Sequence, residues 1–395
     1  MSTTLMPNYA RLPVTFVKGE GAWLWDTQGK RYLDAVSGIA VCSLGHAHPA
    51  IAKAICEQAQ TLLHTSNIYG IAHQQTLADT LIRLTGMETA FFCNSGAEAN
   101  EAAIKISRLY GHQQGIDIPT VIVMENAFHG RTLAALTATG NLKAQAGFDP
   151  LVQGFVRVPY NNIDAIHQVA AQNPNIVAIL AEPVQGEGGV YIPDVGYLQQ
   201  LRTVCDQYNW LLMLDEIQTG IGRTGKWIAC QHEQVLPDVI TLAKALGNGM
   251  PIGACLARGK VAGIFTAGSH GTTFGGNPLA CRTALAVLET IENNQLLNRV
   301  AELGQRIQQG LHNALQETEG VISVRHKGLM IGIELAQPCI PLVAKALEQG
   351  LLINVTANRV IRLLPPFILT NEQADEIINK VSQLVLDFLS VTTTT

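Results

Sequence analysis

Two short apolar runs in the middle of the chain each end abruptly in a polar residue, and this pattern constrains the fold more than any other feature. Residues 210–214 read Trp-Leu-Leu-Met-Leu and are followed by Asp215. Residues 239–243 read Val-Ile-Thr-Leu-Ala and are followed by Lys244. A short, continuous apolar run is typical of a strand that is buried on both faces. Because open α/β sheets bind ligands at the carboxyl ends of their strands, the pattern predicts that Asp215 and Lys244 border one site.

This pair of residues has two interpretations. An amine against low-dielectric walls is easily deprotonated and becomes a nucleophile toward an aldehyde, and a nearby carboxylate holds a heterocyclic nitrogen protonated. The two groups together suit pyridoxal phosphate (PLP), which presents both an aldehyde and a pyridine nitrogen. The alternative is a buried salt bridge between two strand ends, which Asp215 and Lys244 by themselves fit equally well.

The residues that surround this pair favour the first interpretation. Residues 214–226 (LDEIQTGIGRTGK) and 241–253 (TLAKALGNGMPIG) resemble, without gaps, the signature of class III (ω-amino) aminotransferases. The resemblance covers nearly the whole chain. It implies an α/β protein of the fold-type I PLP-dependent transferases, with a large domain built on a mostly parallel sheet and a smaller α+β domain. It also implies PLP as the cofactor, with Lys244 and Asp215 as the catalytic residues.

Two nucleotide-binding patterns overlap the same stretch. Residues 220–225 fit G-x-G-x-x-G, and residues 220–226 fit the P-loop pattern G-x-x-x-x-G-K. However, Trp227 stands where a P-loop needs a hydroxyl group for magnesium, the glycines do not directly follow the strand, and no helix pattern follows them. We therefore interpret these glycines as turn residues.

The chain has 395 residues, enough for two domains that share an interface. Strands alternating with helices from about residue 89 to 257 predict βαβ units, whereas shorter strands are predicted at 321–325, 330–335, 351–355 and 360–364. From these patterns and the resemblance we expect three parts: residues 1–60, an N-terminal segment packing with the small domain; 61–293, the large PLP-binding domain; and 294–395, the small α+β domain. Residues 23–34 read as a β-hairpin, and the final threonines as a frayed tail.

Composition limits the other classes of function. Hydrophobic residues make up 47% of the chain and charged residues 14%, which indicates a globular protein, and the net charge of -5 is unclustered, so neither nucleic acid nor a membrane surface is an expected partner. The eight cysteines are scattered singly, which argues against a zinc site or a disulfide framework. No signal peptide or membrane span is recognisable, so we expect a cytoplasmic protein without a metal. His46 and His48 lack further ligands nearby and are expected to cap or pack.

A phosphate-binding turn is predicted between the strand at 89–93 and the helix that follows. Small residues at a helix N-terminus let backbone amides and a hydroxyl converge on an anion, with the helix dipole adding attraction. The same pattern also fits an ordinary helix cap. The resemblance implies that Ser95, Gly96 and Ala97 bind the cofactor phosphate. It further implies that Glu216, Ile217 and Gln218 contact the cofactor, with Gln218 near the ring hydroxyl, and that Glu182 supports the site.

Substrate carboxylates are assigned to two arginines. Taken alone, Phe128 fits a core position and Arg131 a surface charge, whereas an unpaired Arg362 on an apolar strand would be costly. The resemblance implies that Phe128 stacks on the cofactor ring and that Arg131 binds the carboxylate of the amino donor. It assigns Arg362 to the α-carboxylate of 2-oxoglutarate, with Glu187 as the counter-ion that pairs with Arg362 when that carboxylate is absent.

The glycine-rich loop at 270–278 reads, on its own, as a helix entry. The resemblance places Thr272 at the substrate and Thr273 at the cofactor phosphate held by the other subunit, and so implies a homodimer with shared active sites. The only rival from outside enzymes is a catalytically silent protein that keeps the fold as a binding scaffold. Lys244, Asp215 and Arg362 together argue against it.

The amino donor is predicted to be N2-acetylornithine, transaminated at its terminal amine with 2-oxoglutarate as acceptor, a step of arginine biosynthesis. Ornithine-specific members of the family carry a tyrosine where this chain has Ile39, and an isoleucine cannot hydrogen-bond a free α-amino group. Residues 186–190 (GEGGV) also resemble the acetylornithine enzymes more than those acting on ornithine or 4-aminobutyrate. N-succinylornithine and N-succinyl-diaminopimelate present nearly the same groups and remain alternatives, and ornithine and 4-aminobutyrate are further alternatives within the class.

Overall fold

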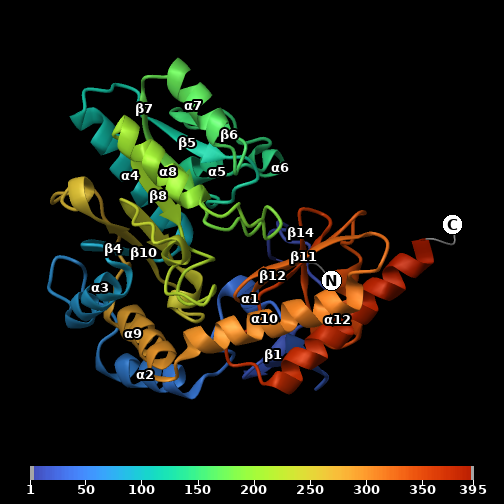
Figure 1. The fold of residues 1–395 in the computed structure, drawn as a ribbon. Coiled ribbons are helices and arrows are strands. Elements are labelled where there is room, and N and C mark those ends of the chain that lie inside the picture. The colour runs from blue at the N-terminus through green and yellow to red at the C-terminus, as the bar shows by residue number, and fades with distance from the viewer. Residues whose placement is uncertain (1–3, 393–395) are drawn as a thin grey trace.

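The computed structural model describes residues 4–392 and is organised around a seven-stranded sheet of order β4-β10-β9-β8-β7-β5-β6 (Figure 1). Its strands are β4 (Thr89–Cys93), β5 (Thr120–Met124), β6 (Phe155–Val158), β7 (Ile176–Ala181), β8 (Leu211–Asp215), β9 (Val239–Leu242) and β10 (Gly253–Ala257). Neighbouring strands from β6 to β9 are parallel, and β10 alone runs antiparallel to its two neighbours. The expected mostly parallel α/β sheet is therefore confirmed. Of the tail predicted at 392–395, Thr392 is instead the last residue of a helix, and residues 393–395 lie outside the described residues.

The central strand β8 is buried on both faces, as its apolar run predicts. Leu212 belongs to the core cluster that includes α8 (Tyr197–Tyr208), whereas Met213 belongs to the cluster that includes α4 (Gly96–Gln113). Successive side chains of a strand point to opposite faces, so Asp215 points to the same side as Met213. This alternation directs the Asp215 carboxylate toward α4.

A second, antiparallel sheet forms in the C-terminal part of the chain, in the order β11-β12-β15-β14. Its strands are β11 (Val321–Lys327), β12 (Met330–Leu335), β14 (Asn354–Thr356) and β15 (Val360–Leu363). The helices α10 (Leu296–Leu315) and α12 (Asn371–Thr392) run side by side next to it (Figure 1), and α11 (Leu342–Glu348) precedes β13.

A third sheet pairs strands from the N-terminal segment with a strand from the C-terminal part of the chain. The predicted hairpin is present as β2 (Trp23–Asp26) and β3 (Arg31–Asp34), with β1 (Phe16–Glu20) beside it. The prediction of one strand at 351–355 is wrong, because β13 (Leu351–Leu352) pairs in parallel with β3 while β14 belongs to the C-terminal sheet. Pairing with a distant strand divides this segment, which its own sequence cannot indicate.

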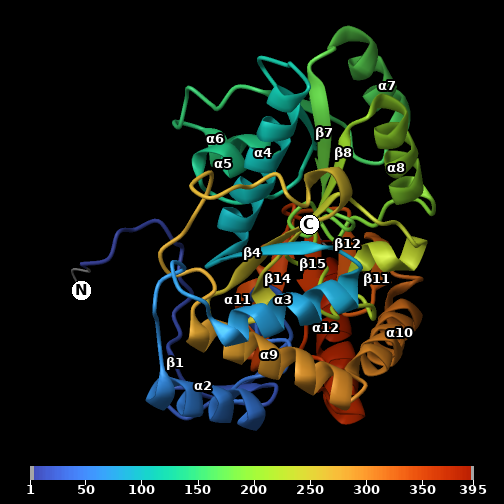
Figure 2. The same ribbon diagram turned by 90° about the vertical axis from the view of Figure 1, so that its left-hand side faces the viewer.

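Three helices gather on one side of the large sheet (Figure 2): α2 (Pro49–Thr61), α3 (Ala72–Thr85) and α9 (Pro278–Asn293). The remaining helices are α1 (Ser37–Ala40), α5 (Leu133–Ala138), α6 (Leu142–Gln145) and α7 (Ile163–Gln172). Within residues 4–392, no helix combines the length and the apolar character needed to cross a membrane.

Candidate active site

A cavity of about 400 Å³ lies at the carboxyl ends of the parallel strands. Its wall is formed largely by residues that follow β4, β5, β7, β8 and β9, as expected for an open α/β sheet. The residues predicted from the sequence that line it are Ser95, Gly96, Ala97, Phe128, Arg131, Glu182, Glu187, Asp215, Ile217, Gln218 and Lys244. The other four predicted residues, Glu216, Thr272, Thr273 and Arg362, are not part of this wall.

Asp215 is buried and held by three hydrogen bonds. Its Oδ2 accepts one from Asn100 Nδ2 at 2.8 Å and one from His129 Nδ1 at 2.7 Å, and its Oδ1 accepts one from the Ile217 backbone N–H at 3.0 Å. Thr241 Oγ1 donates to Asn100 Oδ1 at 2.8 Å, which fixes the orientation of the amide. Asp215 is therefore an oriented acceptor at the cavity wall.

Asn100 and His129 were not among the residues predicted from the sequence. Asn100 is a fully buried polar residue on the apolar face of α4. Because buried polar groups have hydrogen-bond partners, a polar residue on an apolar helix face could have indicated a second polar residue nearby. His129 directly follows the predicted Phe128 and lines the same cavity. Its partner across the sheet was not apparent from the sequence.

Lys244 lies at the cavity wall directly after β9, with a left-handed backbone conformation (φ 45°) that is uncommon for a residue with a side chain. Burial lowers the pKa of its amine to about 8, and the positive charge of Arg362 acts in the same direction. The carboxylates of Glu187, Asp215 and Glu182 oppose this shift. The amine is thus easier to deprotonate than an ordinary lysine, as the sequence predicts.

Glu182 follows β7 and connects two loops of the site. Its Oε1 accepts a hydrogen bond from the Phe128 N–H at 3.0 Å, and its Oε2 accepts one from the Gly186 N–H at 3.1 Å. Burial raises the pKa of Glu182 to about 7, and the nearby Asp215 adds to the shift while His129 opposes it. The carboxyl group positions the loop that carries Phe128 relative to the loop that carries Glu187.

The turn predicted between the strand at 89–93 and the next helix is present at the N-terminus of α4, and its phosphate role remains a prediction. Ser95 is the N-cap, and its side chain accepts a hydrogen bond from the Glu98 N–H at 3.2 Å. A Cβ atom at Gly96 would lie 2.8 Å from Ile217 Cδ1, so a larger residue would displace the Ile217 side chain. Because the helix of 18 residues directs its first amides toward the cavity, this end of the cavity favours an anion.

Arg362, on β15, and Glu187 form an ion pair of 2.8 Å. Arg362 is almost completely buried, with 1% of its side chain exposed, whereas 37% of the Glu187 side chain is exposed. Arg362 also contacts Gln218 Oε1 at 3.3 Å and Asn354 Oδ1 at 2.7 Å. The charge of Arg362 is therefore satisfied, and its carboxylate partner is the more accessible of the two.

Arg131 lies at the open side of the cavity, and its guanidinium group is 5.8 Å from the centre of the Phe128 ring. It is exposed and forms no salt bridge within the part of the chain that the structure describes. An unpaired guanidinium group at a cavity mouth is suited to a carboxylate ligand. The two arginines thus differ in burial and in pairing.

The Glu216 carboxylate points into the protein rather than into the cavity. It accepts hydrogen bonds from the Ala229 and Cys230 N–H groups, both at 2.9 Å, and from the Thr219 hydroxyl. Burial raises the pKa of Glu216. Its side chain holds residues 229–230 against the strand end, and the cofactor contact predicted for Glu216 remains a prediction.

Thr272 and Thr273 lie on the loop before α9. Thr272 Oγ1 accepts a hydrogen bond from Asn94 Nδ2 at 3.2 Å, close to the phosphate turn. Thr273 is exposed, and the neighbouring Phe274 exposes 62% of its surface. Asn67 Nδ2 holds this loop through the carbonyl of Thr272 at 3.2 Å. A threonine turned outward beside an exposed aromatic ring does not contribute to the cavity of its own chain.

The donor side of the cavity differs from the prediction in one residue. Ile39 does not line the cavity, and Val41 does. Ile39 has φ 65° and Ala40 φ 63°, and this left-handed turn directs Val41 toward the site. A turn of this kind is rare for a β-branched residue, so alternation along the sequence does not predict its side-chain directions.

The two histidines that were weighed as metal ligands have other surroundings. His46 Nε2 lies 2.8 Å from Asp34 Oδ2, and His48 precedes α2 without a side-chain capping bond. No group of three or more potential metal ligands occurs among residues 4–390.

The fold and this arrangement of a lysine and an aspartate at neighbouring strand ends define a class of protein. Residues 4–385 match the family Aminotransferase class-III, and the chain belongs to this family. Its relatives include the acetylornithine aminotransferase of Nitrosomonas europaea, 60% identical over 385 residues that cover 98% of each chain. The acetylornithine aminotransferase of Methanocaldococcus jannaschii is 48% identical and covers 95% of this chain and 94% of its own.

Solved structures with the same fold include enzymes named for two different donors. The ornithine aminotransferase from Toxoplasma gondii has a TM-score of 0.94 at 34% identity, covering 99% of this chain and 94% of that one. The acetylornithine aminotransferase from Elizabethkingia anophelis has a TM-score of 0.86 at 36% identity, covering 97% and 96%. Shared backbone geometry therefore defines the class of enzyme, and the donor has to be argued from the site.

Proposed function

We propose that this aminotransferase transfers the terminal amino group of N2-acetylornithine to 2-oxoglutarate, giving N-acetylglutamate 5-semialdehyde and glutamate, a step of arginine biosynthesis. The observation that carries the proposal is the cavity whose wall includes Lys244, Asp215 and Arg131, with Arg362 paired to the wall residue Glu187. The 60% identity to an enzyme named for acetylornithine supports the choice of donor.

The cofactor of this proposal is pyridoxal 5'-phosphate. The residues present fit it: the α4 N-terminus with Ser95, Gly96 and Ala97 suits a phosphate, Phe128 offers a ring for stacking, and Asp215 offers an oriented carboxylate for a ring nitrogen. Ile217 lies above Gly96 at the same wall, and Gln218 offers an amide to the ring hydroxyl. When bound, PLP supplies an aldehyde that binds amines and a pyridine ring that takes up electrons from the substrate carbon.

Lys244 and Asp215 divide the catalytic work between them. Lys244 would hold the cofactor through its aldehyde, and its neutral amine would accept the proton from the carbon that bears the terminal amine of the donor. Asp215 would keep a proton on the pyridine nitrogen, because its carboxylate is held in place by Asn100 and His129. Glu182 orders the two loops beside them through its hydrogen bonds to the Phe128 and Gly186 N–H groups.

Two carboxylates are bound by two arginines in this proposal. Arg131, unpaired and exposed, takes the carboxylate of the donor, whereas Arg362 takes the α-carboxylate of 2-oxoglutarate after Glu187 has moved away. Arg362→Ala should weaken the half-reaction with 2-oxoglutarate by about 2 to 4 kcal/mol, as for a buried charge-assisted pair. Equal damage to the half-reaction with the donor would contradict this division of roles.

The apolar side of the cavity supports the choice of a donor whose α-amino group is acylated. Val41 lines this side, next to Ile39, and neither residue offers a hydrogen bond to a free α-amino group. The test is to compare kcat/KM for acetylornithine, succinylornithine, N-succinyl-diaminopimelate, ornithine and 4-aminobutyrate, with 2-oxoglutarate as acceptor. A preference of tenfold or more for ornithine or 4-aminobutyrate would disprove the acyl donor, and absence of turnover with all five would favour a binding protein.

The enzyme of this proposal is a homodimer with shared active sites. Asn67 is hydrogen-bonded to the loop that carries Thr272 and Thr273. Several large apolar side chains on this loop and on the segment around Asn67 are exposed: Leu62, Leu63, Ile68, Tyr69 and Phe274. Apolar surface next to a site favours coverage by another protein surface. A second copy of the chain would bury this surface and bring Thr273 to the phosphate end of the neighbouring cavity.

The remaining assignments follow the same reasoning. We divide the chain into residues 1–60, 61–293 and 294–395, a division supported by the separate sheets and by the pairing of β3 with β13. A cytoplasmic location is consistent with eight cysteines that are all free thiols. The expected partners are the amino donor and 2-oxoglutarate, with no nucleic acid and no membrane.

A further inference from the structure

Asn354 and Arg362 are directly opposite each other on the antiparallel strands β14 and β15. On its other side, Arg362 is paired with Gly332 of β12, which has no side chain. Side chains of directly opposed residues lie on the same face of a sheet and within reach of each other. The register of these strands therefore places Asn354 beside the guanidinium group of Arg362, whereas Val190 packs over Gly332 on the other side, 3.0 Å from where a Cβ atom of that residue would lie.

The partners of Arg362 bind different nitrogen atoms of its guanidinium group. Asn354 Oδ1 accepts from Nε at 3.1 Å and from Nη2 at 2.7 Å, so one neutral oxygen occupies one edge of the group. Glu187 Oε1 and Gln218 Oε1 both accept from Nη1, at 2.8 Å and 3.3 Å. The edge that Asn354 occupies is thus separate from the nitrogen that binds the Glu187 carboxylate.

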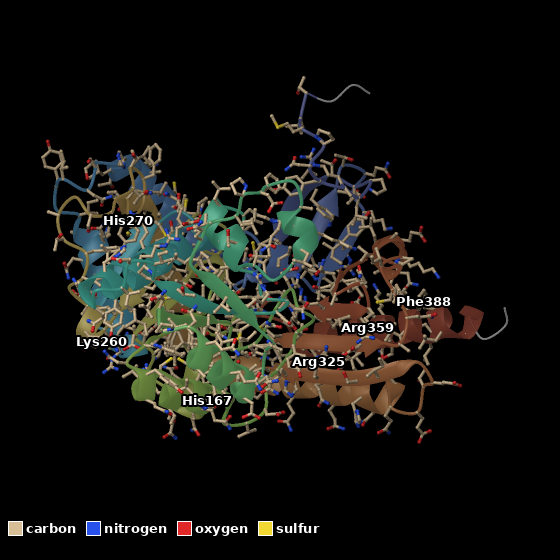
Figure 3. All side chains as sticks on the ribbon, turned by 90° about the horizontal axis from the view of Figure 1, so that it is seen from above. His167, Lys260, His270, Arg325, Arg359 and Phe388 are labelled. Carbon is tan, nitrogen blue, oxygen red and sulfur yellow. The ribbon has the colours of Figure 1, made fainter. Side chains whose placement is uncertain are left out.

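The Glu187 side chain can leave without its backbone moving. Thr356 Oγ1 donates a hydrogen bond to the Glu187 carbonyl. Arg325, on β11 of the same sheet (Figure 3), donates to the Gly189 carbonyl through Nη2 at 2.6 Å. With these carbonyls held, the movable part is the Glu187 side chain, 37% exposed, while Arg362 is 1% exposed.

We propose that Asn354 is a positioning residue for the acceptor substrate. It holds Arg362 by the Nε and Nη2 edge while Nη1 exchanges the Glu187 carboxylate for the α-carboxylate of 2-oxoglutarate or glutamate. Because the amide is neutral, it fixes the guanidinium group without neutralising it. An aspartate at the same place would form a permanent ion pair with Arg362 and weaken the binding of any other carboxylate to Arg362. This inference rests on the proposed function, in that the acceptor is a dicarboxylate bound by Arg362.

The test compares three holoenzyme variants with the unaltered enzyme. Asn354→Ala removes the oxygen, Asn354→Asp replaces it with a charged one of the same shape, and Asn358→Asp adds the same charge to the exposed turn of the same hairpin. Binding of glutarate, a dicarboxylate without a keto group, is measured by calorimetry. Single-turnover absorbance then follows the donor half-reaction with acetylornithine and the acceptor half-reaction with 2-oxoglutarate.

For Asn354→Ala we expect the dissociation constants of glutarate and 2-oxoglutarate to rise about tenfold, the size of one charge-assisted hydrogen bond. Asn354→Asp should raise them further, while both variants leave the donor half-reaction within about twofold and Asn358→Asp changes neither. The inference is overturned if glutarate binding stays within twofold in both Asn354 variants, or if the donor half-reaction slows equally. Failure of the proposed donor is a separate result, because it shows in the unaltered enzyme and leaves the glutarate measurement valid.

Discussion

His129 Nδ1 lies 2.7 Å from Asp215 Oδ2, and only 0% and 4% of the two side chains are exposed. The hydrogen bond is therefore formed away from water, where it restrains the carboxylate more strongly than it would at the surface. His129 Nε2 has no hydrogen-bond partner within the described residues, so the ring makes its one polar contact through Asp215. The imidazole and the Asn100 amide together fix the direction in which Asp215 faces the cavity.

This relationship predicts a graded response to substitution. Asp215→Asn should retain cofactor but lose several orders of magnitude in kcat, because a neutral amide cannot hold the proton on the pyridine nitrogen. His129→Ala keeps the Asp215 charge and loses one charge-assisted bond, so kcat should fall roughly ten- to a hundredfold. The measurements are kcat and the cofactor content of the purified protein. A His129→Ala enzyme with unchanged kcat would show that Asn100 and the Ile217 N–H are sufficient to orient Asp215.

Lys244 predicts the pH dependence of cofactor binding. Burial, together with the charge of Arg362, lowers the pKa of its amine to about 8. Only the neutral amine attacks an aldehyde, so the rate of covalent PLP binding by the cofactor-free protein should rise about tenfold per pH unit below pH 8 and level off above it. Stopped-flow absorbance at a series of pH values gives this profile. A rate that keeps rising beyond pH 10 would indicate a lysine with an ordinary pKa.

The sequence predicted those features of the site that are local in the chain. The apolar runs that end at Asp215 and Lys244 form buried strands because strand burial follows from consecutive residues. The partners of Asp215 were not predictable in this way, since Asn100 and His129 lie 115 and 86 positions away and meet it only when the sheet and α4 have packed. Val41 lines the cavity where the sequence had pointed to Ile39. The cause is a left-handed turn at Ile39 and Ala40, which a hydrophobic pattern cannot predict.

The proposed homodimer predicts that two inactive variants complement each other. Lys244→Ala leaves Thr273 intact, and Thr273→Asp, which places a negative charge at the proposed phosphate contact, leaves Lys244 intact. A mixed dimer then has one complete site, and random mixing should restore roughly a quarter of the normal activity. Mixing Lys244→Ala with Asp215→Asn is the control, because both residues serve the site of their own chain and no complete site forms. A monomer that is fully active on dilution would refute the shared site.

Arg223 makes the last prediction, which concerns stability. It is completely buried on the loop after β8, where Nη1 donates to the Pro365 carbonyl at 2.5 Å and Nη2 donates to Ser43 Oγ at 2.8 Å. Its guanidinium group also lies 4.7 Å from the centre of the Phe367 ring. One side chain therefore links the large sheet to the N-terminal segment and to the C-terminal part of the chain.

Arg223→Ala should lower the free energy of unfolding by about 3 kcal/mol or more, because it leaves buried acceptors unpaired and a cavity beside the Phe367 ring. Arg223→Lys should restore little of this loss, since a single ammonium group cannot reach both acceptors and lie on the ring. Arg359→Ala is the matched control: this arginine is 50% exposed, pairs with Glu334 at 2.7 Å on the surface, and should change stability by less than about 1 kcal/mol. Urea titration of the three variants measures these differences. Equal losses for Arg223→Ala and Arg359→Ala would show that the buried guanidinium group does not hold the three segments together.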